Sequence, residues 1–160
     1  MKKETLVFGA GCFWGAQDLI RKVKGVLKTE VGYSGGDLKN PGYREVSTGQ
    51  TGHAEAVLVE FDSEQLSRAE LLDLFFKLHN PTTKDRQGGD MGSQYRSILF
   101  VNSEEEREMA HQAILRAQKH WPEPIVTEIE DLKPFYSAEE EHQDYLQKNP
   151  HGYTCHYWRE

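Results

Sequence analysis

The chain has few cysteines and no long hydrophobic run. Two cysteines in 160 residues are too few for the disulfide framework of a small secreted protein, so we expect reduced thiols and a cytoplasmic location. No apolar stretch approaches the ~20 residues that a membrane-spanning helix needs. The N-terminal segment MKKETLVFGAG suits a strand better than a signal peptide. These absences predict a soluble globular protein.

Positive charge is also in short supply. Lysine and arginine number 19 against 26 aspartates and glutamates, which gives a net charge of −7. Because a nucleic-acid surface needs a basic patch, this balance argues against nucleic acid as a partner. The sequence has no repeats, low-complexity tracts or linkers. Its length therefore predicts a single domain over residues 1–160.

The apolar residues that are present follow strand and helix spacings in turn. Short apolar runs predict strands at 6–9, 26–33, 53–61, 95–101 and 125–129. Helical spacing follows the first strand at 16–23. Pairs of serine and glutamate in the S-x-x-E pattern of a capping box predict helices that start at Ser67, Ser103 and Ser137.

The first six elements follow the order β-α-β-β-α-β of the split βαβ, ferredoxin-like pattern. We therefore predict an α+β fold with a two-layer ferredoxin-like core, an extra C-terminal helix and a coiled tail. Right-handed crossovers run the first two strands in one direction, and the next two strands return. One edge of the sheet then gathers the turn at Gly11–Cys12, the long loop before His53 and the loop before Tyr95. Loops this long are usually functional or disordered, so this edge is the expected site.

The segment FGAGCFWG places Cys12 between two glycines where a helix starts. Unpaired N–H groups and the helix dipole stabilise an anion at such a position, so we expect a lowered thiol pKa and a reactive thiolate. The flanking glycines would let backbone and substrate approach closely. Phe13 and Trp14 suggest an apolar pocket for a small alkyl group. The alternatives are a buried structural cysteine and aromatic side chains that only fix the helix to the core.

Glu55 is the second unusual residue. Strand alternation places it on the same face as Val57, Val59 and Phe61. A carboxyl group on an apolar face tends to keep its proton. Beside a thiolate it would act as a proton donor. The alternative is an edge position where Glu55 simply reaches water.

Further polar candidates come from the converging loops and from the tail. Tyr43, Asp90 and Tyr95 each carry a group that can form a hydrogen bond at one shared polar point, although each alone is also an ordinary loop residue. We expect the tail around Cys155 to be mobile, so that this thiol either attacks an oxidised Cys12 or stays idle. The remaining histidines are expected on the surface, at positions 79, 111, 120, 142 and 151.

Several ordered motifs resemble the A-type peptide methionine sulfoxide reductases. They run along most of the chain, with GCFWG at 11–15, GYSGG at 32–36, TGHAEAV at 51–57, GGDMGSQYRS at 88–97 and NP-x-GY at 149–153. The resemblance implies an α+β oxidoreductase that reduces the S epimer of methionine sulfoxide, free or in proteins, and so repairs oxidised proteins. It implies thioredoxin as the usual electron source. We expect no cofactor, no metal and a monomer.

The same resemblance assigns roles to the candidate residues. It implies that Cys12 is the nucleophile and that Phe13 and Trp14 hold the substrate methyl group. It implies that Glu55 protonates the sulfoxide oxygen. It implies that Tyr43, Asp90 and Tyr95 help to bind this oxygen.

The tail departs from the family pattern. Many relatives place the recycling cysteine directly after Gly-Tyr and continue with glycines, whereas Thr154 intervenes here and HYWRE follows Cys155. We expect Cys155 to capture a sulfenic acid on Cys12 as a disulfide. Without this capture, an outside thiol would have to reduce Cys12 directly.

Three other functions fit parts of the sequence. A cysteine hydrolase would use Cys12, His53 and either Glu55 or Asp90, and it requires His53 within hydrogen-bond reach of the thiol. A metal-binding regulatory module would use the two cysteines, His156 and another histidine, but the paired C-x₂₋₄-C spacing of structural zinc sites is missing. A non-catalytic reader would bind oxidised methionine in an aromatic pocket without reducing it.

Overall fold

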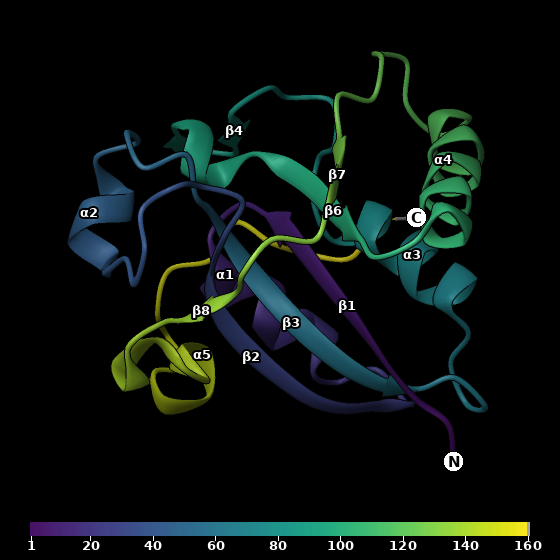
Figure 1. Ribbon diagram of the computed structural model, residues 1–160, viewed down its shortest axis with the longest axis horizontal. Helices are drawn as coiled ribbons and strands as arrows, with labels where there is room; N and C mark the ends of the chain where they lie inside the picture. Colours follow the sequence, from purple (N-terminus) through teal and green to yellow (C-terminus); the bar gives the residue numbers. More distant parts are fainter. Residues whose placement is uncertain (160) are drawn as a thin grey trace.

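A six-stranded mixed sheet forms the centre of the computed structural model, which describes residues 1–159 (Figure 1). The strand order is β7-β6-β1-β3-β2-β8. These strands are β1 (Lys3–Ala10), β2 (Val26–Ser34), β3 (Ala54–Asp62), β6 (Ser97–Val101), β7 (Glu128–Asp131) and β8 (Tyr136–Ser137). A separate two-stranded hairpin pairs β4 (Arg86–Gln87) with β5 (Asp90–Met91).

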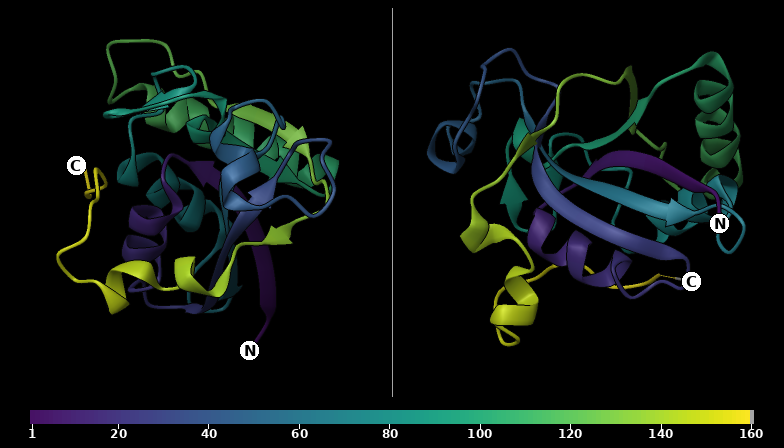
Figure 2. Two further views of the ribbon diagram at one scale, coloured as in Figure 1. Left: turned by 90° about the vertical axis from the view of Figure 1, so that its left-hand side faces the viewer. Right: turned by 60° about the horizontal axis from the view of Figure 1, so that its bottom comes forward.

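Helices cover one face of this sheet, as the two views of Figure 2 show for α1. The helices are α1 (Phe13–Ile20), α2 (Tyr43–Ser47), α3 (Arg68–Leu78), α4 (Glu104–Gln118) and α5 (Tyr145–Lys148), with 3₁₀ turns at Ser93–Tyr95 and Glu140–His142. Leu6 and Phe8 of β1 belong to the core shared with α1, α3 and α4, whereas Val7 packs in a smaller cluster on the other face. The alternation of β1 therefore supplies both faces of the sheet.

Strand directions bring four chain segments to one edge of the sheet. β1 is antiparallel to both β3 and β6, and β2 is antiparallel to β3. The end of β1 at Ala10 consequently lies opposite Ser97, where β6 begins. The end of β2 at Ser34 likewise lies opposite Ala54, where β3 begins. This edge is the one at which the sequence places the candidate site.

The capping box at Ser67 forms as predicted. The Glu70 backbone N–H donates to Ser67 Oγ at 3.1 Å, and Glu70 Oε1 accepts from the Ser67 N–H at 3.0 Å. At Ser103 only half of the box forms, because the Glu106 carboxylate accepts from the N–H of Asn102 instead.

The predicted helix start at Ser137 and Glu140 is wrong. Ser137 lies in β8 and pairs with Gly32 of β2, while its hydroxyl donates to the Glu30 carboxylate. Pairing with the free edge of the sheet satisfies the backbone at this point, so no helix begins. Glu140 opens only a 3₁₀ turn, and the last helix starts at Tyr145.

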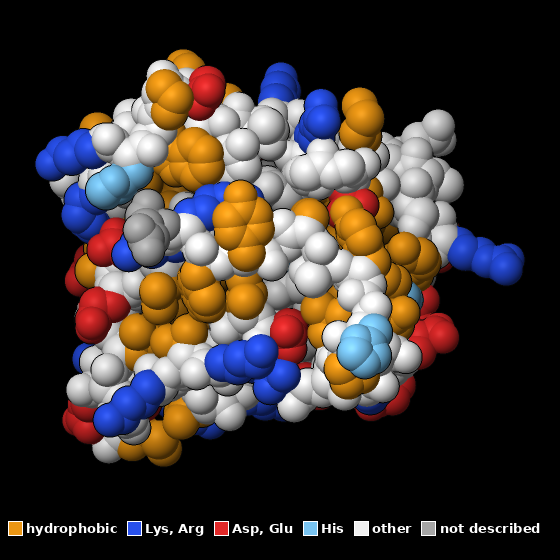
Figure 3. Space-filling model, turned by 180° about the vertical axis from the view of Figure 1, so that it is seen from behind, with side chains coloured by type: hydrophobic (Ala, Val, Ile, Leu, Met, Phe, Trp, Pro, Cys, Tyr) orange, Lys and Arg blue, Asp and Glu red, His pale blue; other side chains and the backbone are white. Residues whose placement is uncertain are grey.

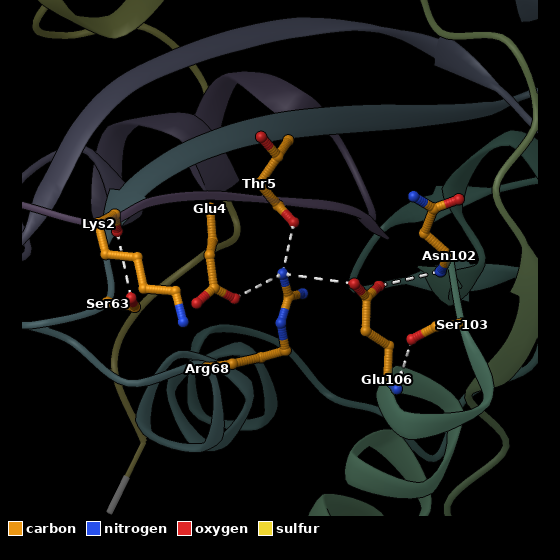
Figure 4. A network of polar contacts seen from close by, with 8 residues as sticks. All are labelled: Lys2, Glu4, Thr5, Ser63, Arg68, Asn102, Ser103 and Glu106. Atoms are coloured by element: carbon orange, nitrogen blue, oxygen red, sulfur yellow. Dashed lines mark hydrogen bonds and ion pairs between the residues drawn. The ribbon is translucent and has the colours of Figure 1, made fainter.

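Arg68 joins α3 to β1 and α4 through a buried guanidinium group (Figure 4). Its side chain is 8% exposed, and Nη2 donates to the Thr5 carbonyl at 2.8 Å and to Glu4 Oε1 at 3.3 Å. The same nitrogen lies 3.8 Å from Glu106 Oε2 on α4. The guanidinium carbon is 5.4 Å from the centre of the Phe61 ring. Three parts of the fold thus depend on one side chain.

Replacing Arg68 by alanine is expected to lower the free energy of unfolding by about 2 kcal/mol, because partly buried carboxylates lose their partner. The matched control is Arg107→Ala. Arg107 pairs with Asp131, whose side chain is 88% exposed, so its loss is expected to cost under ~1 kcal/mol. Urea denaturation of both variants measures the difference. Equal losses would contradict the role given to Arg68.

The surface is mixed in charge on the side seen from behind. In Figure 3, basic and acidic side chains stand among hydrophobic ones on this face. None of the helices within residues 1–159 has both the length and the hydrophobicity for a membrane crossing.

Candidate active site

Cys12 lies at the junction between β1 and α1. Gly11 turns the chain with φ of 89°, a conformation that favours glycine, and Cys12 then caps the helix. The Cys12 side chain is buried, at 8% exposure. Glu55, the second residue of β3, is 1% exposed. Its Oε1 accepts a hydrogen bond from the Phe13 backbone N–H at 3.2 Å, so the first turn of α1 and the start of β3 are in direct contact.

Glu55 is a carboxyl group that keeps its proton at neutral pH. Burial raises its pKa to about 8, and Asp90 contributes to the rise, while the hydrogen bond from Phe13 acts in the opposite direction. The alternative that Glu55 reaches water at an edge is wrong, because almost none of the residue is accessible. Strand alternation holds, since Val57 and Phe61 lie with α1 in the main core.

The expected low pKa of Cys12 is wrong. Burial raises the pKa of the thiol above its ordinary value, and Glu55 raises it further, while the Trp14 backbone N–H only partly offsets both. Loss of hydration outweighs the start of a short helix, and the N–H of Phe13 is already directed at Glu55. The site therefore holds a neutral thiol next to a neutral carboxyl group.

Tyr43, Asp90 and Tyr95 gather around this pair from three different elements. Tyr43 begins α2, Asp90 begins β5 and Tyr95 ends the 3₁₀ turn before β6. Burial raises the pKa of both tyrosines, and the charges of Glu55 and Asp90 raise it further. The ring of Tyr43 lies 4.5 Å from that of His142, which also accepts a hydrogen bond from Trp14 in the first turn of α1. The structure therefore brings together the polar candidates that the sequence takes from separate loops.

The two aromatic residues after Cys12 have different surroundings. Phe13 is 1% exposed and packs within the core, with its ring 5.7 Å from that of Tyr33. Trp14 is partly exposed, and its ring stacks on Tyr145 at 3.8 Å. The indole Nε1–H donates to Nδ1 of His142 at 3.0 Å. Trp14 is thus the more accessible of the two rings, and Phe13 is part of the core.

His142 and Tyr145 both contact Trp14, and the sequence patterns predict neither contact. His142 is 8% exposed rather than on the surface, and its ring lies 4.5 Å from that of Tyr43. The signal available was an aromatic pair at short spacing in a segment without apolar periodicity. His79 is also buried, with ring nitrogens 2.8 Å from the Phe75 carbonyl and the Ser97 hydroxyl. Burial lowers its pKa to about 3, so it stays neutral.

His53 is not available as a catalytic base. Its Nδ1 accepts from the Gly36 N–H at 3.1 Å, and its Nε2 lies 2.6 Å from the Leu38 carbonyl, which only accepts. Both ring nitrogens therefore bind the loop that follows β2. The Cys12–His53 pair that a hydrolase would use is therefore not formed, because His53 has no nitrogen left for Cys12.

The tail that carries Cys155 is packed against the site. Cys155 is partly buried, and its Sγ lies 3.8 Å from the Gln87 carbonyl and 3.9 Å from Asp90 Oδ2. The hydroxyl of Tyr153 donates to the same Asp90 oxygen at 3.3 Å. Through these contacts the tail lies against the β4–β5 hairpin, and both cysteines are free thiols. Within residues 1–159 no three histidine, cysteine or acidic side chains are placed to hold a metal ion.

A pocket of about 450 Å³ lies apart from this cluster, between α3, α4 and the tail. Its apolar walls are Phe76, Trp121 and Tyr157. Its lining includes none of the candidate residues, so size alone does not identify the site. The buried thiol and the carboxyl group with a raised pKa identify the candidate site instead.

A cysteine next to a proton-bearing carboxyl group, with a second free thiol in contact with Asp90 nearby, fits a thiol-dependent oxidoreductase. Comparison with known proteins narrows this class. Residues 4–160 match the family model described as peptide methionine sulfoxide reductase. The chain belongs to this family.

Individual relatives agree along nearly the whole chain. Peptide methionine sulfoxide reductase MsrA of Methanothermobacter thermautotrophicus is 52% identical over 149 residues, which are 92% of this chain and 88% of the relative. Mxr1 from Saccharomyces cerevisiae in reduced form matches with a TM-score of 0.95 and 38% identity, over 99% of this chain and 93% of that one. A structure of Mxr1 in complex with Trx2 matches with a TM-score of 0.69 and 27% identity, over 99% and 91% of the two chains.

Proposed function

We propose that this chain reduces methionine sulfoxide to methionine with electrons from the Cys12 thiol, and so repairs oxidised proteins. The observation that carries the proposal is the contact between α1 and β3, which puts a protonated Glu55 beside Cys12. A sulfoxide oxygen is a poor leaving group unless it is protonated. Membership in the family supplies the substrate class.

The reaction balances with the groups present. Cys12 Sγ attacks the sulfoxide sulfur while Glu55 gives its proton to the sulfoxide oxygen. The thiol proton of Cys12 restores the carboxyl group. The hydroxyl group then passes from the substrate sulfur to Cys12 Sγ. As it does so, the S–O bond of the substrate and the new bond between the two sulfurs both break, methionine leaves, and Cys12 becomes a sulfenic acid. Since Cys12 starts neutral, its proton leaves during the attack instead of before it.

The surrounding residues select and hold the substrate. Trp14, backed by Phe13, receives the methyl group on sulfur, because the two rings supply the apolar wall of the site. The hydroxyls of Tyr43 and Tyr95 hold the oxygen, and the high pKa of each keeps its proton available to donate. Asp90 orients these groups or a water molecule. Preference for the S epimer follows from the family resemblance.

Recycling requires a second thiol. We assign it to Cys155, which contacts Asp90, and to an external dithiol such as thioredoxin. The complex of Mxr1 with Trx2 supports this kind of partner. We further infer a monomeric, cytoplasmic protein with one domain. Its ferredoxin-like core is supported by the order β6-β1-β3-β2 with antiparallel neighbours.

Turnover on separated sulfoxide epimers tests the proposal. With thioredoxin and its reductase, the S epimer of a peptide or free methionine sulfoxide is expected to yield methionine, while the R epimer is not consumed. The control replaces the sulfoxide with an ester. Acid release from the ester, or binding of the sulfoxide without methionine formation, would show a hydrolase or a reader instead.

A further inference from the structure

Gly11 and Gly15, the two glycines around Cys12, make room for the tail. A methyl group built at Gly15 would collide with Thr154 Oγ1 and with the His156 ring. One built at Gly11 would press on the Gln87 side chain and lie 3.4 Å from His156 Nε2. The expectation that these glycines serve substrate access is therefore incomplete. They form a slot, and residues 154–156 of the tail occupy it.

His156 fastens the tail in this slot. It is 7% exposed, and its Nε2 lies 2.5 Å from the carbonyl oxygen of Ala10, the last residue of β1. A carbonyl oxygen only accepts, so Nε2 carries the hydrogen. Burial lowers the pKa of His156 to about 4, which keeps the ring neutral and this tautomer fixed. Its Nδ1 then faces Cys155 Sγ at 3.9 Å.

Thr154, the residue that departs from the family pattern, takes part in the same anchor. Its hydroxyl oxygen accepts the backbone N–H of His156 at 3.1 Å, which closes a tight turn around Cys155. Further along, the Arg159 N–H donates to the Lys77 carbonyl of α3 at 2.8 Å. Cys155 is therefore fixed on both sides. Because Thr154 and His156 lie against Gly15 and Gly11, Cys155 is held beside the turn that carries Cys12.

We propose that His156 is a positioning residue for the recycling step, because its bond to Ala10 holds the tail with Cys155 beside the turn that carries Cys12. The proposal rests on the function proposed above. In this step Cys155 Sγ attacks the sulfur of the Cys12 sulfenic acid. The S–O bond breaks as the S–S bond forms, and hydroxide leaves with the Cys155 proton as water. Cys155 is oxidised, and the Cys12 sulfur is reduced to the disulfide level.

Three substitutions of His156 distinguish the effect of the hydrogen bond to Ala10 from the effect of the rest of the imidazole ring. In His156→Gln the amide nitrogen reaches the position of Nε2 and keeps the donor to Ala10. In His156→Asn the amide reaches only the position of Nδ1, and His156→Leu has no polar group. Each variant is mixed with one equivalent of sulfoxide without reductant. The burst of methionine counts the reactive Cys12, and acid-quenched mass spectrometry times the Cys12–Cys155 disulfide.

Per unit of burst, disulfide formation is expected to slow about tenfold in His156→Leu and His156→Asn, as the loss of one buried hydrogen bond predicts. His156→Gln is expected to restore most of the rate. In the slow variants dimedone should trap more sulfenic acid. A wild-type rate in His156→Leu, or a rate in His156→Gln as low as in His156→Leu, would overturn the proposal.

Two controls distinguish this proposal from the function on which it rests. Cys155→Ser is expected to give the burst and no disulfide, with the sulfenic acid persisting. A wild-type burst without any Cys12–Cys155 disulfide would overturn the role of His156 and leave the reductase function standing. A missing burst in the wild-type chain would reject the reductase function itself.

Discussion

Replacement of Cys12 by serine is expected to reduce methionine formation from sulfoxide to the uncatalysed background. A serine hydroxyl of nearly the same size occupies the junction of β1 and α1, so the fold should persist. Oxygen is a much weaker nucleophile than sulfur at neutral pH and has no sulfenic acid chemistry. A single-turnover assay that detects methionine directly measures the effect, because it needs no recycling.

Cys155→Ser is the matched control, since it removes the other thiol and leaves the first step intact. Unfolding by urea shows whether both variants are folded. Methionine formation by folded Cys12→Ser at more than a small fraction of the wild-type burst would reject the proposed mechanism. Loss of the burst in both variants would mean that the first step also needs Cys155, and would contradict its assignment to Cys12 alone.

Replacement of Glu55 by glutamine is expected to slow the reductase step by a factor of about 10²–10⁴, the range for a lost general acid. Glutamine keeps the shape and the hydrogen bond from Phe13 but has no acidic proton. In the wild-type chain the rate should fall as the pH rises through about 8, because Glu55 then loses its proton. Stopped-flow measurement of the burst over a pH series tests both points. A variant with an unchanged rate constant would remove Glu55 from the mechanism.

Stability separates a chemical effect from a structural one. The pKa of Glu55 rises from 4.5 to about 8 on folding, so the folded chain binds this proton more tightly. The contribution of Glu55 to stability is complete below pH 4.5 and is lost as the pH rises toward about 8. Glutamine has no charge to bury, so Glu55→Gln should be at least as stable as wild type at pH 8. A large loss of stability would make its low activity uninformative and contradict the burial argument.

Local pattern was sufficient for much of the fold. Alternation at 53–61 places Glu55 with Val57 and Phe61, and crossover handedness brings the ends of β1 and β2 to the edge that holds Cys12. The mixed α/β fold is that of the solved relatives. Ser137 shows the limit of such reasoning. Its capping signal is local, but the free edge of strand β2 is nearby, and the segment pairs with that edge as β8.

The pKa values of the site residues depend on how deeply each side chain is buried, and local sequence patterns do not predict this burial. A helix start predicts a thiolate at Cys12, yet burial and the neighbouring carboxyl group raise the pKa of the thiol. Burial of His79, His142 and His156 could not be predicted either, because it depends on partners that are distant in the chain. His156 binds Ala10, which is 146 positions away. No motif or periodicity records a contact of this kind.

The hydrogen bond from the Phe13 N–H to Glu55 has an energetic consequence for the direction of catalysis. A charged acceptor makes such a bond about twice as strong as a neutral one. The contact is therefore modest while the acid is intact and tightens once its conjugate base appears. The first turn of α1 thus supplies the Phe13 N–H to the oxygen of the acid and the Trp14 N–H to the sulfur, and the Phe13 N–H favours the transition state, in which negative charge grows on Glu55.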